Sequence, residues 1–107
     1  MAVPGIRVFW RNNEIGDLTI LEVDMWYSYC KWDANESIEA IQFKEMVANF
    51  NTAEIMKDYS KGTRITLQYP GSNETTNALV ISLENDALLI RNVYDAVAVK
   101  WLVENVY

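Results

Sequence analysis

Apolar side chains recur at every second position in several separate stretches of the chain, and this feature constrains the fold most. A two-residue period places the apolar side chains of a strand on one face, so it predicts strands with one buried side. The first such stretch begins at Ile6, and a second covers residues 17–23. Turn-forming residues separate the two, so we expect a hairpin over residues 6–23. The alternation continues from Met25 to Trp32, which predicts a third strand, with an ordered aromatic loop as the alternative.

The middle of the chain changes to the period of a helix. Large apolar residues follow a 3.6-residue repeat there, with Phe43 at the margin of the stripe, and they predict a helix over about residues 36–50. The stripe consists of Ile38, Ile41, Met46, Val47 and Phe50. Thr52 can then cap a short second helix over Ala53–Lys57.

Alternation returns in the last part of the chain, where a strand with one buried face is predicted over Ile65–Tyr69. Two further runs, residues 76–83 and 87–93, carry apolar side chains on both faces and are separated by a tight turn. We expect these runs to be central strands, because both of their faces must be covered. Asp95 can cap a final helix that runs to the C-terminus.

The predicted order of elements is β-β-(β)-α-(α)-β-β-β-α. Strands grouped in this way, with few β-α-β crossovers, favour an α+β fold, with an antiparallel sheet of about five or six strands and two main helices packed on one face. A chain of 107 residues has the usual length of one domain, and no linker or internal repeat divides it. We therefore expect residues 1–107 to form a single compact domain.

The net charge of −6 belongs entirely to one segment of the chain. Residues 14–45 contain eight acidic residues and two lysines, whereas the rest of the chain contains seven acids and seven bases. The same segment holds a dense run of tryptophans and tyrosines. Such side chains are enriched among the residues that dominate binding at protein interfaces, and surrounding carboxylates accelerate encounter with a cationic partner.

These features favour a small acidic protein-binding module that docks a basic partner through residues 14–45. One form of this hypothesis is an inhibitor or immunity-type protein, in which carboxylates imitate phosphates and the rings anchor the complex, so that a basic nuclease is occluded. The candidate binding residues are Asp17, Glu22, Asp24, Trp26, Tyr27, Tyr29, Trp32 and Asp33.

Three alternatives remain open at this point. Trp26 and Trp32 could belong to the core, which is the simpler interpretation for both because Trp is highly buried on average. The aromatic strand could pair with the same strand of a second copy, which would make the protein a homodimeric structural domain. The exposed rings could also bind a small ligand or a carbohydrate.

Several function classes are excluded or disfavoured by composition. The chain has no histidine, which excludes Ser-His, Cys-His and His-metal mechanisms. No nucleotide-binding glycine motif occurs, so we expect no enzymatic activity, no cofactor and no metal site. The acidic balance argues against a nucleic-acid partner, and no apolar run approaches the length of a membrane span.

Cys30 is the only cysteine, so no disulfide can form within the chain. A lone thiol without a histidine partner is expected to be a small buried hydrophobe. The first residues show neither the basic nor the apolar region of a signal peptide. Together these features predict a cytoplasmic protein without a membrane association.

Overall fold

The computed structural model describes residues 2–92, 99, 100 and 104. Within residues 2–92, six strands, two short α-helices and one 3₁₀ turn follow one another along the chain. They are β1 (Val3–Trp10), β2 (Asn13–Asp24), β3 (Tyr27–Ala34), α1 (Ile38–Ala48), α2 (Thr52–Lys57), η1 (Tyr59–Lys61), β4 (Thr63–Gln68), β5 (Thr75–Glu84) and β6 (Ala87–Asn92). The final helix expected from Asp95 lies, apart from isolated positions, outside the described residues.

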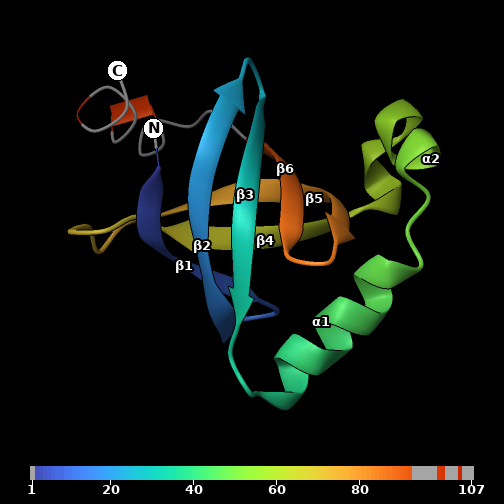
Figure 1. The fold of residues 1–107 in the computed structure, drawn as a ribbon, viewed down its shortest axis with the longest axis horizontal. Helices are drawn as coiled ribbons and strands as arrows, with labels where there is room; N and C mark the ends of the chain where they lie inside the picture. Colours follow the sequence, from blue (N-terminus) through green and yellow to red (C-terminus); the bar gives the residue numbers. More distant parts are fainter. Residues whose placement is uncertain (1, 93–98, 101–103, 105–107) are drawn as a thin grey trace.

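The six strands form a closed antiparallel barrel in the order β1-β2-β3-β6-β5-β4 (Figure 1). Each half of the chain supplies a three-stranded meander, and two pairings join the halves. Strand β3 pairs with β6, with Tyr29 opposite Leu89, and β1 pairs with β4, with Val8 opposite Leu67. The predicted α+β fold, an open sheet with two helices packed on one face, is therefore wrong, because the sheet curls until its first and fourth strands meet.

Helix α1 covers the end of the barrel at which β1 and β3 carry their tryptophans (Figure 1). Phe43 of α1 is fully buried, and its ring centroid lies 5.6 Å from that of Trp10 and 5.7 Å from that of Trp32. A closed barrel of this size fills its interior with side chains, and here a helix supplies the last of them. The core therefore sits inside the barrel rather than between a sheet and a layer of helices.

The predicted helix over residues 36–50 exists as α1, but its buried face differs from the predicted stripe. The helix starts after Ser37, whose hydroxyl accepts a hydrogen bond from the Ala40 amide at 3.1 Å. Its fully buried residues are Ala40, Phe43 and Val47. Ile38 and Ile41 instead face outward, because the barrel opening accepts Phe43 and the neighbouring small Ala40.

Helix α2 packs on the outer wall of the barrel against β5. Ile55 of α2 and Ile81 of β5 are buried outside the main core cluster. This second, smaller contact explains why the run 76–83 is apolar on both faces. Asn51 caps the helix, rather than the expected Thr52, with its side chain accepting from the Glu54 amide at 3.2 Å.

Candidate functional site

The outer face of the β2–β3 hairpin brings together most of the sequence-predicted binding residues. Trp32, Cys30 and Ser28 point into the barrel, so the residues between them on β3 point outward. On β2, a bulge between Ile20 and Glu22 changes the register. We call the outward side chains of the two strands and their turn the hairpin face. It consists of Asp17, Thr19, Leu21, Glu22, Asp24, Met25, Trp26, Tyr27, Tyr29, Lys31 and Asp33.

Seven of the eight predicted residues lie on the hairpin face, and Trp32 does not. The four predicted acids, Asp17, Glu22, Asp24 and Asp33, are all exposed. Among the rings, Trp26 is 48% exposed at the turn, Tyr29 is 43% exposed and Tyr27 is half-buried. Trp32 is only 4% exposed and packs on Phe43, so it belongs to the core. For Trp26, the simpler interpretation as a core residue is wrong, because it sits in the turn.

Cross-strand pairing sets acids beside rings along this face. Glu22 lies opposite Tyr29, and Asp24 lies opposite Tyr27. At the other end of the hairpin Asp17 lies opposite Asp33. Residues directly opposite each other on neighbouring strands have adjacent side chains, so these pairs form a row in which negative charge and aromatic surface are mixed.

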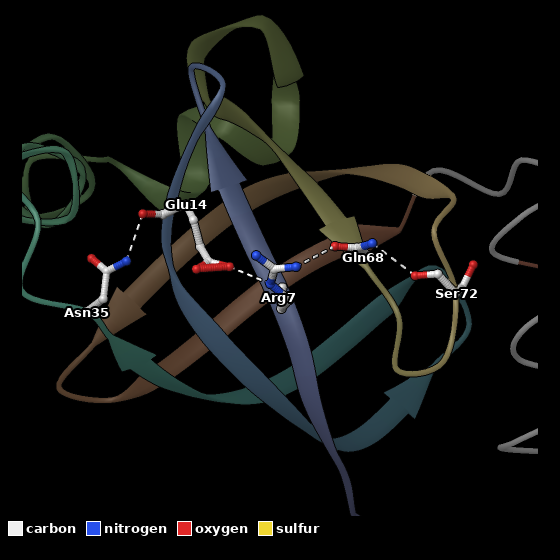
Figure 2. A network of polar contacts seen from close by, with 5 residues as sticks. All are labelled: Arg7, Glu14, Asn35, Gln68 and Ser72. Atoms are coloured by element: carbon white, nitrogen blue, oxygen red, sulfur yellow. Dashed lines mark hydrogen bonds and ion pairs between the residues drawn. The ribbon is translucent and has the colours of Figure 1, made fainter.

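The acids on the hairpin face lack ion-pair partners within the part of the chain that the structure describes. Arg7 of β1 lies close to this face, but its guanidinium is already engaged (Figure 2). It donates to a Glu14 carboxylate oxygen and, over 3.1 Å, to the Gln68 side-chain oxygen. The Gln68 amide in turn donates to the Ser72 carbonyl at 3.0 Å. The two contacts of Arg7 therefore join β1 to β2 and to β4.

A polar hollow of about 430 Å³ lies at the Asp17–Asp33 end of the hairpin. Gly16 belongs to its lining, and β2 and β3 approach so closely there that an added Cβ would collide with the Asp33 carbonyl oxygen. Asn35 closes one side, with its amide donating to the Glu14 carbonyl at 2.7 Å (Figure 2). Within residues 2–92, 99, 100 and 104, no three side chains of the kinds that bind metals are grouped closely enough to hold an ion.

An aromatic cluster at the opposite end joins the hairpin turn to η1 and β6. The Arg91 guanidinium carbon lies 5.0 Å from the ring centroid of Tyr59, 5.5 Å from that of Trp26 and 5.9 Å from that of Tyr27. The Tyr27 and Tyr59 hydroxyls are hydrogen-bonded at 3.2 Å. This hydrogen bond is the main reason why the pKa of Tyr27 is raised above its ordinary value. The cluster fixes the position of the rings relative to the barrel wall.

A second hollow, largely apolar and of about 250 Å³, lies where the hairpin face meets β6 and β5. Tyr29, Leu89 and Ser82 are cross-strand neighbours there, and Leu21 lies beside them on β2. Leu21 is 50% exposed.

Sequence reasoning missed Leu21, Leu89, Tyr59 and Arg91 as residues of this surface. Leu21 lies outside the simple alternation because of the β2 bulge, which no single-sequence pattern marks. The other three reach the hairpin only through long-range pairing, such as that of Tyr27 with Arg91. The residue types of Leu89, Tyr59 and Arg91 indicate a place on this surface only when the closure of the barrel is known.

Cys30 is buried, as predicted, at 3% exposure. Burial raises the pKa of its thiol from 9.0 to about 12, because the thiolate loses its hydration inside the barrel. A thiol that stays protonated is a poor nucleophile, so Cys30 contributes packing rather than chemistry.

Fold and surface together define the described part of the chain as a small closed β-barrel whose hairpin face combines exposed acids with aromatic rings. Comparison with protein-family models, with curated proteins and with solved structures finds no match for this chain. None of the helices in the described ranges combines the length and the apolar character that a membrane crossing requires.

Proposed function

We propose that this chain is a protein-binding module that docks a basic partner through the hairpin face. The observation that carries the proposal is the pairing of exposed acids with aromatic rings, Glu22 opposite Tyr29 and Asp24 opposite Tyr27, where neither acid forms an ion pair with a described residue. Stiff rings provide contact area at a small entropic cost, and unpaired carboxylates attract and orient a cationic surface.

The charge of this face also distinguishes among partners. Two copies of the chain meeting through it would place carboxylates against carboxylates, which disfavours a homodimer of this kind. Each strand of the barrel already has two hydrogen-bonded neighbours, so the barrel offers no free edge strand through which a second copy could pair.

An inhibitor or immunity-type role, in which the acids occlude the binding surface of a basic nuclease, is one form of the proposal. A cytoplasmic location and a role without catalysis belong to the same proposal.

The test is capture from native lysate with three baits. They are the wild type, the Glu22→Lys/Asp24→Lys variant and a Glu45→Lys/Glu74→Lys control, in which two exposed acids outside the hairpin are reversed. Both variants have the same net charge, so a difference between them reports position rather than total charge. We expect basic proteins to be retained by the wild type and the control and to be lost by the hairpin variant. Equal retention by all three baits, or no retention by any, would contradict the proposal.

A further inference from the structure

The apolar hollow on the barrel wall has a specific origin in residue size. Ala87 and Ser82 are the small residues of its lining, and larger side chains rise around them. Tyr29 and Leu89, which are cross-strand neighbours, belong to this lining, and so does Leu21 at the β2 bulge. Most of the exposed area inside the hollow is therefore carbon, although it opens on an acidic face.

Carboxylates stand at the margin of this hollow. Glu84 belongs to its lining and lies opposite Ala87. Glu22 follows Leu21 along β2 and lies opposite Tyr29. Lys31 lies opposite Ala87, but it forms no ion pair with these carboxylates or with any other described residue. Arg91 is engaged by the aromatic cluster.

We propose that the hollow receives one large apolar side chain of the basic partner, flanked in that partner by lysines or arginines that reach Glu22 and Glu84. This inference rests on the proposed function and adds the chemistry of the bound segment to it. Leucine, isoleucine, methionine and phenylalanine are the side chains of the required kind. The combination of a buried apolar anchor and a charged rim is the usual anatomy of a protein interface.

Size and charge favour this occupant over others. At about 250 Å³ the hollow is smaller than the cavities that enclose drug-sized ligands, which start near roughly 300 Å³, so it fits one side chain better than a small organic molecule. A second copy of this acidic chain would bring further carboxylates to Glu22 and Glu84, whereas a basic segment neutralises them.

The experiment titrates isotope-labelled protein with three short peptides and follows the backbone amide resonances by NMR. The first peptide has one leucine flanked by lysines, the second has glycine in place of leucine, and the third has glutamates in place of the lysines. We expect the lysine–leucine peptide to shift the resonances of Leu21, Tyr29, Ala87 and Leu89. The glycine peptide should bind about tenfold more weakly, because burial of a leucine side chain is lost, and the glutamate peptide should not bind.

A variant in which a larger side chain fills the hollow tests the anchor site in the protein itself. Ala87→Leu replaces a small exposed residue of the lining and should remove the advantage of the leucine peptide while leaving binding of the glycine peptide unchanged. The control is Ala53→Leu, the same change at an exposed position of α2, which should behave as the wild type.

The outcomes separate this inference from the proposed function. Equal affinity for the leucine and glycine peptides, centred on the hairpin face, would overturn the anchor site and leave the basic-partner proposal standing. Equal affinity for the lysine and glutamate peptides would contradict the proposed function itself. An absence of shifts with every peptide would overturn the anchor site, and the capture experiment would then decide the proposed function independently.

Discussion

Trp32 of β3 and Phe43 of α1 meet inside one end of the barrel, with ring centroids 5.7 Å apart and planes inclined by 55°. This contact joins the barrel to the helix that covers its end. It also decides the orientation of β3, because a Trp32 that points inward leaves Tyr27 and Tyr29 pointing outward.

Phe43→Ala should lower the free energy of unfolding by about 3–5 kcal/mol, because it removes a fully buried ring and leaves a cavity between Trp10 and Trp32. Ile41→Ala on the same helix should change it by less than about 0.5 kcal/mol, since Ile41 is exposed. Denaturant unfolding measures both. A larger effect at Ile41 than at Phe43 would mean that α1 buries the other face.

Gly16→Ala should lower the free energy of unfolding by at least about 3 kcal/mol. Gly16 has a φ of 151°, and an added Cβ would collide with the Asp33 carbonyl oxygen of the neighbouring strand. Gly71→Ala is the control for backbone conformation alone, because its φ is 78° and nothing lies within 4 Å of an added Cβ. That control should cost about 1–2 kcal/mol. Thermal or denaturant unfolding that gives equal losses would argue against the close approach of β2 and β3.

Stability should fall as the pH rises above about 9, partly because of Cys30. Its pKa is about 12 in the folded chain and 9.0 ordinarily, so above pH 9 the unfolded chain releases the proton first. The contribution is fully present below pH 9 and is lost as the pH rises towards 12. Cys30→Ala should therefore flatten the profile by up to about 1.4 kcal/mol per pH unit in this window. Denaturant titrations that give parallel profiles for the two proteins would contradict the assignment.

Tyr59→Phe should lower the pKa of Tyr27 towards 10.0, because the hydrogen bond between the two hydroxyls is the main cause of the raised value. The measurement is an NMR titration of ring-labelled tyrosine. Tyr29→Phe serves as the control, since Tyr29 acts on Tyr27 only through a minor electrostatic effect. An unchanged Tyr27 titration in Tyr59→Phe would show that η1 does not hold the hairpin turn in solution.

The local elements of this fold were accessible from the sequence, and its closure was not. Alternation locates β1 and β2, and the helical period locates α1. Alternation reports which side of a strand faces inward, but it does not report which strands are neighbours. The pairing of Val8 with Leu67 closes the barrel and joins residues far apart in the chain, so no local sequence pattern predicts it.

The candidate site, like the fold, could be predicted from the sequence only in part. Most of the charge excess and the aromatic run lie on the hairpin, and strand alternation separates the inward Trp32 from the outward Tyr29 once the register is known. The β2 bulge that exposes Leu21 and the long-range approach of Arg91 depend on tertiary structure. The apolar hollow, which combines residues of four strands, could be found only in the folded chain.

The most direct test of the docking face compares affinity for the lysine–leucine peptide at low and high ionic strength. Salt weakens attraction between exposed charges, so wild-type binding should fall steeply as salt is added. At low ionic strength, Glu22→Lys/Asp24→Lys should bind about tenfold more weakly and lose most of the salt dependence, while Glu45→Lys/Glu74→Lys should keep both. A hairpin variant with wild-type affinity and an unchanged salt slope would contradict the account.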